Sequence, residues 1–143
     1  TRVPMSVSWP GNIAPGVSPA VFSQVDLLAT LATLTGGTIP AGDSQNALDV
    51  LLGKSLTGRA AIVQEGISGL ALRARDWKFI PPSKGMETIK DMRSGNSPGP
   101  QLYQISKDPA ETRNLAKEHP EKRKELAAML EEISGLPPKG ESN

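Results

Sequence analysis

The chain has 143 residues, the size of one ordinary domain, yet only 3% are aromatic, and 14 Gly and 13 Pro interrupt nearly every segment. This composition favours several small packed units joined by loops over one dense core. The 16 Lys and Arg balance 15 Asp and Glu, so no field of one sign favours nucleic acid, and the absence of Cys excludes disulfides, thiolate nucleophiles and Cys-based zinc sites.

The first predicted element is a strand from Val3 to Trp9. Apolar residues alternate there with proline and serine, the period-2 pattern of a half-buried strand, and Pro10-Gly11-Asn12 follows as a turn. An unpaired apolar strand exposes backbone donors and acceptors together with its side chains. We therefore expect residues 3–9 of the isolated chain either to pair with a second copy or another chain, or to be poorly ordered.

Residues 22–37 predict a helix. Ser23 is a suitable N-cap with Asp26 three residues later, and Gly36-Gly37 supplies a C-terminal stop. Small residues such as Ala29 and Thr30 occupy one face and allow a neighbour to approach closely. The opposite face carries a leucine stripe at helical spacing, which consists of Leu27, Leu28, Leu31 and Leu34.

The middle of the chain predicts short elements. Ala47 to Leu52 indicates a short apolar helix, and Ala60 to Gln64 a strand. Residues 69–80 read as a hairpin with its turn at Arg75-Asp76. A long Gly- and Pro-rich stretch from Pro81 to Pro100 follows, of the kind that is usually functional or disordered, and then a strand at residues 102–105.

The last elements are helical. Asp108-Pro109-Ala110-Glu111 indicates a helical turn, and a longer helix begins at Pro120 and ends at Gly135. Large side chains are scarce, so we expect Trp77 and Tyr103 to lie on one small sheet. They should bury against the apolar stripe of the last helix, which consists of Leu126, Met129, Leu130 and Ile133.

Residues that could carry chemistry are few and scattered. His119 could serve as a general acid or a ligand, or simply lie exposed at a helix entry, and Trp77 with Lys78 could bind a ligand or anchor the core. The acidic residues do not cluster, and the last helix interleaves Glu with Lys as a solvated face does. No nucleophile-elbow, phosphate-loop or His-Glu-x-x-His motif is present. We predict no self-sufficient active site and no metal site in this chain.

Five segments in order nevertheless resemble the C-terminal part of a sulfatase of the arylsulfatase type, within the alkaline phosphatase-like superfamily. They span most of the chain, and an Asp-Pro-x-Glu-Thr-x-Asn-Leu run after a Leu-Tyr strand is characteristic of the family. The matching segments are RVPMSVSWPGNIAPG, SQVDLLATLATLTG, DVLLGKS, LALRARDWKFI and QLYQISKDPAETRNLAKEHPE.

The resemblance implies an α/β fold in three parts. Residues 1–59 would be the end of a large mixed-sheet domain, with Val3 to Trp9 as an edge strand and the helix from Ser23 packed on that sheet. Residues 60–136 would form a small four-stranded antiparallel sheet covered by the C-terminal helix, and residues 137–143 a mobile tail.

The resemblance also implies chemistry that lies mostly upstream of this sequence. Sulfatases use a formylglycine made within a Cys/Ser-x-Pro-x-Arg motif and a calcium ion held by Asp and Asn. Ser8 to Asn12 begins that pattern but has Asn12 where Arg is required. No catalytic or metal-binding residue is therefore expected in this chain. Arg2 matches the family's Arg-Val-Pro segment and is the one candidate substrate-binding residue, although a structural ion pair explains it equally well.

Two functions from different classes follow. The chain is either the C-terminal portion of a hydrolase of sulfate esters, or a noncatalytic binding or scaffolding module of sulfatase ancestry. In the first case its partner is the N-terminal catalytic part of the same protein, the substrate is a sulfated small molecule or sugar, and the location is periplasmic or secreted. No apolar run approaches the roughly 20 residues that a spanning helix needs, so no membrane partner is expected. The segment from Pro81 to Pro100 could carry substrate selectivity.

Overall fold

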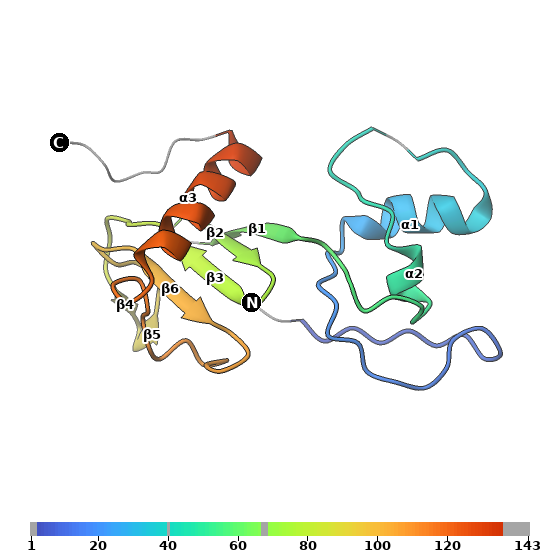
Figure 1. The fold of residues 1–143 in the computed structure, drawn as a ribbon, viewed down its shortest axis with the longest axis horizontal. Helices are drawn as coiled ribbons and strands as arrows, with labels where there is room; N and C mark the ends of the chain where they lie inside the picture. Colours follow the sequence, from blue (N-terminus) through green and yellow to red (C-terminus); the bar gives the residue numbers. More distant parts are fainter. Residues whose placement is uncertain (1–2, 40, 67–68, 136–143) are drawn as a thin grey trace. The chain divides into compact units, whose positions relative to one another are not determined.

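The structure is a computed structural model that describes residues 3–39, 41–66 and 69–135, so the expected tail at residues 137–143 lies outside the described residues. The chain divides into two compact units, unit 1 within residues 1–60 and unit 2 within residues 61–143 (Figure 1). Among the helices that the structure describes, none has the length and apolar character needed to cross a membrane.

Unit 2 contains the predicted four-stranded antiparallel sheet. Its strand order is β1-β2-β3-β6, and each neighbouring pair is antiparallel. The β2–β3 hairpin turns at Arg75 and Asp76 as predicted, with Arg75 at a φ of 51°. The strands are β1 (Ala61–Gly66), β2 (Gly69–Ala74), β3 (Trp77–Ile80) and β6 (Gln101–Gln104).

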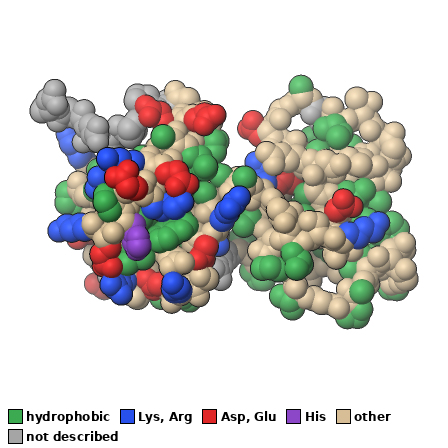
Figure 2. All heavy atoms as spheres, viewed as in Figure 1, with side chains coloured by type: hydrophobic (Ala, Val, Ile, Leu, Met, Phe, Trp, Pro, Cys, Tyr) green, Lys and Arg blue, Asp and Glu red, His purple; other side chains and the backbone are tan. Residues whose placement is uncertain are grey.

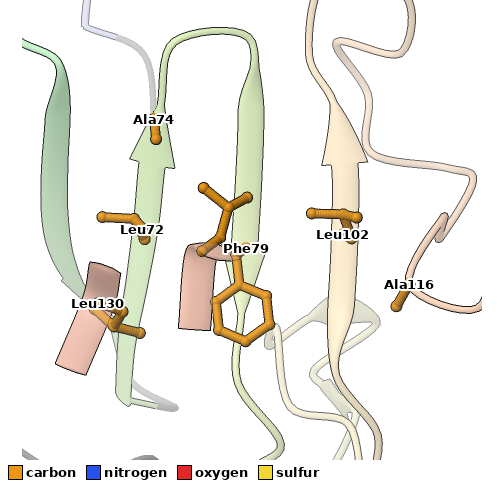
Figure 3. Packing of buried hydrophobic residues seen from close by; sticks show 7 residues of the cluster. Leu72, Ala74, Phe79, Leu102, Ala116 and Leu130 are labelled. Atoms are coloured by element: carbon orange, nitrogen blue, oxygen red, sulfur yellow. The ribbon is translucent and has the colours of Figure 1, made fainter. Parts of the chain in front are cut away.

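One long helix, α3 (Pro120–Ser134), packs across β1, β2 and β3 (Figure 1). Pro120 occupies its first turn, and Gly135 ends it in the left-handed conformation at a φ of 63°. The buried cluster between helix and sheet is shown in Figure 3 and consists of Leu72, Ala74, Phe79, Leu102, Ala116, Leu126 and Leu130.

The prediction that Trp77 and Tyr103 both bury against α3 was correct for only one of them. Trp77 is half-buried and packs at the margin of the buried cluster. Tyr103 is buried but pairs with Lys78 in the sheet, and because side chains alternate along a strand it faces away from Phe79 and α3. Ile133, which was predicted to belong to the buried stripe of this helix, is 52% exposed and does not contribute to the buried cluster.

The long stretch after β3, residues 81–100, is an ordered loop. It contains a small hairpin of β4 (Thr88–Ile89) and β5 (Met92–Arg93). The side chain of Asn96 holds its base together, accepting from Ser83 Oγ at 3.0 Å and donating from Nδ2 to Met86 O at 3.1 Å. Hydrogen bonds made by side chains thus supply the order that a Gly- and Pro-rich composition does not predict.

Residues 108–111 form a turn and not the start of a helix. Glu111 N donates to Asp108 O at 3.1 Å, but the φ of Glu111 is 56°, which is incompatible with a right-handed helix. Asn114 then covers the outer edge of β6, because its Oδ1 accepts from Leu102 N at 3.0 Å. The helical prediction for residues 108–111 was wrong because Glu111 adopts this left-handed conformation.

Unit 1 is built around α1 (Asp26–Thr35) and the four-residue α2 (Leu48–Leu51). Gly36 ends α1 at a φ of 73°, as predicted. The start differs from the prediction, since α1 begins three residues after Ser23 and no side chain bonds to its N-cap position. Half of the predicted capping arrangement is nevertheless formed, because the Ser23 N–H donates to Asp26 Oδ2 at 3.2 Å.

The predicted strand from Val3 to Trp9 is not formed. These residues lie outside both sheets that the described part of the chain contains, and their side chains are exposed. A strand exists only with a hydrogen-bonding neighbour, and none of the described segments supplies one. The alternating pattern therefore identifies an apolar segment whose partner is not among the described residues.

Candidate functional site

A buried ion pair between Asp26 and Arg59 is the most enclosed polar cluster among the described residues. Arg59 approaches the carboxylate side-on, with Nη2 donating to Oδ1 at 2.6 Å and Nε to Oδ2 at 2.7 Å. The Asp26 side chain is 0% exposed and that of Arg59 is 14% exposed. This two-point geometry fixes both side chains and joins the first turn of α1 to the segment that precedes β1.

Backbone groups complete this cluster. Asp26 also accepts from Gln45 N at 2.9 Å and from Ser23 N, while Arg59 donates to Asp43 O. Burial raises the pKa of Asp26, but the hydrogen bonds from Arg59 and the two backbone N–H groups outweigh burial and leave this pKa below its ordinary value. A carboxylate with a lowered pKa and four donors around it is a poor proton acceptor, so the pair acts as a clamp.

The rest of the polar side of α1 is bound to the loop before α2. Ser44 Oγ accepts from Ala29 N at 2.9 Å, which satisfies a free N–H group in the first turn of the helix. Thr30 Oγ1 accepts from Ala47 N at 3.0 Å. Ala29 and Thr30 are fully buried, so the face with small residues does contact a neighbour.

The opposite side of α1 is exposed although it is apolar. We define the α1 apolar face as Val25, immediately before the helix, and three leucines within it. The exposed fractions are 53% for Val25, 60% for Leu28, 47% for Leu31 and 36% for Leu34. A shallow hollow beside it is lined by residues that include Val25, Leu28 and Asp43. Figure 2 shows apolar side chains at the surface of unit 1, on the right of the view. Three residues of the predicted leucine stripe, Leu28, Leu31 and Leu34, are therefore exposed, whereas Leu27 is half-buried.

The residues singled out in unit 2 do not assemble a reactive centre. His119 is exposed just before α3, and its ring meets Trp77 edge-on at 5.3 Å between centroids, which agrees with the helix-entry interpretation. Lys78 donates to Glu111 Oε2 at 2.7 Å from the other face of the sheet. Because Trp77 and Lys78 point to opposite faces, they do not form one ligand site.

Asp76 likewise has a structural role, at the turn between β2 and β3. Asp76 accepts from Ser106 N at 2.7 Å and from Ser106 Oγ at 2.6 Å. Burial raises the pKa of Asp76, yet these bonds leave that pKa below its ordinary value. No group of three His, Cys, Asp or Glu side chains in the described ranges is placed to hold a metal ion. Arg2, the predicted substrate-binding residue, lies outside the described residues.

Sequence reasoning missed Arg59, the partner that makes Asp26 a buried charge. The two residues are 33 positions apart, and an isolated Arg after Gly58 gives no local signal of a long-range ion pair. The one available indication is the helix position of Asp26, on the same side as Ala29 and Thr30. A charge on a face of small residues needs a buried partner.

Comparison with known proteins gives a consistent set of relatives. The chain is 43% identical over 139 residues to an N-acetylgalactosamine-6-O-sulfatase of Bacteroides thetaiotaomicron, a match that covers 93% of this chain and 27% of that protein. It is 34% identical to human arylsulfatase A, with coverage of 80% and 26%. The chain thus spans about a quarter of the length of the curated relatives it matches. No family model matches the sequence.

Solved structures support the same relationship. One, from work on the metabolism of multiple glycosaminoglycans by Bacteroides thetaiotaomicron, superposes with a TM-score of 0.82 at 40% identity and covers 90% of this chain and 28% of that one. A 2-O GAG sulfatase superposes with a TM-score of 0.54 at 23% identity, covering 81% and 27%, and shows the shared fold alone.

Proposed function

Because the chain is a homologue of the C-terminal part of sulfatases, we propose that it is the C-terminal portion of an enzyme that hydrolyses sulfate esters. The observation that carries this proposal is the 43% identity over 139 residues to a sulfatase of which the chain matches 27%. Sequence identity this high over 139 residues reflects common descent of the whole segment. The superposition with a TM-score of 0.82 over 90% of the chain supports the same conclusion.

In this proposal the reaction itself belongs to residues upstream of Thr1. Sulfatases rely on a formylglycine nucleophile and calcium, and the described residues here do not fit either group. They offer no set of three metal-binding side chains, and the sequence has no Cys and no Cys/Ser-x-Pro-x-Arg segment. We therefore assign both groups to the N-terminal catalytic part, the main partner of this chain, and derive no catalytic step from the residues described.

The role proposed for this chain is structural support of the enzyme. Unit 1 would complete the large domain, while unit 2 would form the small subdomain and border the substrate pocket. Arg2 would lie near the sulfate because it matches the family's Arg-Val-Pro segment. A periplasmic or secreted location would suit an enzyme that acts on sulfated small molecules or sugars.

The relatives indicate which substrates to test first. The relative with 43% identity is an N-acetylgalactosamine-6-O-sulfatase. We therefore propose a sulfate ester on a sugar as the substrate class, with 6-O-sulfated N-acetylgalactosamine and an aryl sulfate as the two test compounds.

The decisive experiment compares this chain with the longer protein that begins upstream of it. We expect the longer protein, with calcium, to release sulfate from at least one test compound, and the 143-residue chain to release none above a buffer control. Replacing the upstream Cys or Ser of the Cys/Ser-x-Pro-x-Arg motif by Ala should abolish release. An upstream sequence without that motif, together with no release, would favour the noncatalytic binding or scaffolding module instead.

A further inference from the structure

An aromatic pair and an arginine lie at the start of α3, and we name Trp77, His119 and Arg123 the α3 entry cluster. Trp77 is half-buried at the margin of the buried cluster, and its ring meets His119 edge-on, with 5.3 Å between ring centroids and 65° between ring planes. Figure 2 shows the single His of the chain, in purple, at the surface of unit 2. Because His119 is exposed, the aromatic pair is accessible from solvent.

Arg123 follows His119 by one turn of α3. Its N–H donates to His119 O at 3.0 Å, and residues four positions apart lie on the same side of a helix. The spacing from Arg123 to Leu126 and Leu130, which are both buried, places Arg123 at the start of the stripe that faces the sheet. Arg123 is half-buried, yet its guanidinium has no hydrogen bond or ion pair to the residues that the structure describes. It therefore has N–H donors available for an anion.

The acidic side chains on either side of His119 are already paired with other cations. Glu118 Oε2 accepts from Arg113 Nη2 at 2.8 Å, and Glu121 Oε1 lies 3.4 Å from Lys124 Nζ. Arg123 thus keeps a positive charge that neither carboxylate balances by direct contact. The whole chain has a net charge of only +1, so this unbalanced charge is a local property of the α3 entry cluster.

We propose that the α3 entry cluster is a noncatalytic binding site for a sulfated sugar, whose ring packs against Trp77 and His119 and whose sulfate group binds Arg123. Aromatic side chains offer apolar contact to the C–H face of a sugar ring, and a few convergent polar groups fix its orientation. The guanidinium presents a fork of N–H donors suited to two oxygens of one anion. Gln104 lies directly opposite Trp77 in the sheet and adds an amide on the same face for the sugar hydroxyls.

The choice of a sulfated sugar rests on the proposed function, which supplies that substrate class. The position of the site does not, because it follows from the geometry of unit 2. The sequence allowed a ligand site that combines Trp77 with Lys78. Lys78 points to the other face of the sheet and binds Glu111, so the cation that accompanies Trp77 in this site is Arg123.

Two-dimensional NMR of the 143-residue chain, titrated with 6-O-sulfated N-acetylgalactosamine, tests the site. The chain has two Trp residues, so the indole N–H signal of Trp77 reports on the site and that of Trp9, which is exposed in unit 1, is the internal control. We expect the signals of Trp77, His119 and Arg123 to shift together with a dissociation constant on the order of 1 mM, as is reasonable for a small ligand on an open surface. The Trp9 signal should stay unchanged.

The sulfate group and each side chain can be removed in turn. Unsulfated N-acetylgalactosamine and the variant Arg123→Ala should each weaken binding by about tenfold or more, because the charge-assisted hydrogen bonds are lost. Arg123→Lys should weaken it less, since Lys keeps the charge but not the two-point fork. His119→Ala should weaken it by about threefold. Lys124→Ala is the matched control, an exposed cation of the same helix paired with Glu121, and it should bind as the unaltered chain does.

Three results would overturn the proposal. The first is the absence of any shift at Trp77 and Arg123 up to about 20 mM sugar. The second is equal affinity of the unaltered chain and Arg123→Ala, with far-UV circular dichroism showing that both are folded. The third is equal affinity for inorganic sulfate and for the sulfated sugar, which would leave an anion contact to which the aromatic pair contributes nothing.

The outcomes are distinct from those that test the proposed function. Binding at the α3 entry cluster without sulfate release by the longer protein would leave the site standing and remove the proposed function. Sulfate release without any shift at Trp77 would overturn the site and leave the function standing. In the longer protein, Arg123→Ala should release sulfate from the same sugar as fast as the unaltered protein does. A loss of release in that variant would overturn the noncatalytic role.

Discussion

Asp26 and Arg59 illustrate how a single charge can organise a segment that has almost no apolar core. The carboxylate lies in the first turn of α1, a favourable place for negative charge, and binds two loop N–H groups besides the guanidinium. Replacing a buried pair by apolar groups is often harmless, but removing one partner leaves the other charge buried and unpaired. The clamp is therefore sensitive to single substitutions.

We predict that Asp26→Asn destabilises unit 1 by about 1–3 kcal/mol, because Arg59 keeps its charge in a half-buried position without a counterion. Urea unfolding followed through the backbone NMR signals of α1 measures this loss. The double variant Asp26→Leu with Arg59→Met is the control, and it should recover part of the stability. A loss below about 1 kcal/mol in the single variant would show that water reaches Arg59 freely.

The same clamp predicts a dependence on pH. The pKa of Asp26 is lowered in the folded chain, so its contribution is complete above the ordinary Asp pKa of about 3.9 and is lost as the pH falls through the lowered folded value. We expect the urea midpoint of the α1 signals to be constant between about pH 7 and 5 and to fall below about pH 4. In Asp26→Asn this acid-induced fall should largely disappear. A fall of equal size in that variant would assign the effect to other carboxylates.

At the scale of elements, the sheet of unit 2 distributes its aromatic residues unevenly. Phe79 is 2% exposed within the cluster under α3, while Trp77 stands at the cluster margin against His119. Tyr103 lies on the other face, where its hydroxyl donates to Gln101 Oε1 at 2.8 Å. How much an aromatic residue contributes to the stability of unit 2 therefore depends more on which face of the sheet it occupies than on its size.

Phe79→Ala is accordingly expected to cost about 3–5 kcal/mol, the range for emptying a buried aromatic site, and Trp77→Ala clearly less because Trp77 is only half-buried at the margin of the cluster. Denaturant unfolding monitored by far-UV circular dichroism would rank the two variants. Met86→Ala, an exposed position, serves as the control with little change. Equal costs for Phe79→Ala and Trp77→Ala would contradict this packing.

Elements specified by local pattern could be predicted from the sequence, and those specified by distant partners could not. The β2–β3 hairpin and the C-terminal stops at Gly36 and Gly135 follow from alternation and from residues that tolerate positive φ. The strand expected from Val3 to Trp9 failed because pairing requires a neighbour. The leucine stripe of α1 was visible in the sequence, but the clamp that turns it outward depends on Arg59, 33 residues away.

The candidate site is even harder to predict from local sequence pattern than the fold is. The sequence predicts that no metal or nucleophile constellation is present, and this absence stays a prediction. Arg2 stays a prediction because it lies outside the described residues. The resemblance to sulfatases supports the proposal that this chain is part of a larger enzyme, which pattern and spacing within this chain do not contain.

At the scale of the whole molecule, the two units are stabilised by different kinds of interaction. Unit 2 combines a four-stranded sheet, a helix and a buried apolar cluster, which is sufficient for a small autonomous fold. Unit 1 combines a ten-residue helix with a hydrogen-bonded clamp, and its larger apolar side chains are half-buried or exposed. Hydrogen bonds near solvent open more readily than those under a packed core, so the units should differ in local stability.

Amide hydrogen exchange on a dilute, demonstrably monomeric sample would measure that difference. We expect strong protection in β2, β3 and α3, weaker protection in α1, and none at Val3 to Trp9, because those residues have no ladder partner among the described segments. In the longer protein, α1 and residues 3–9 should gain protection while α3 changes little, since only unit 1 lacks burial of its own. Strong protection of residues 3–9 in the monomeric 143-residue chain would show that these residues have a hydrogen-bonding partner within the chain. Unit 1 would then need no further protein surface to complete its fold.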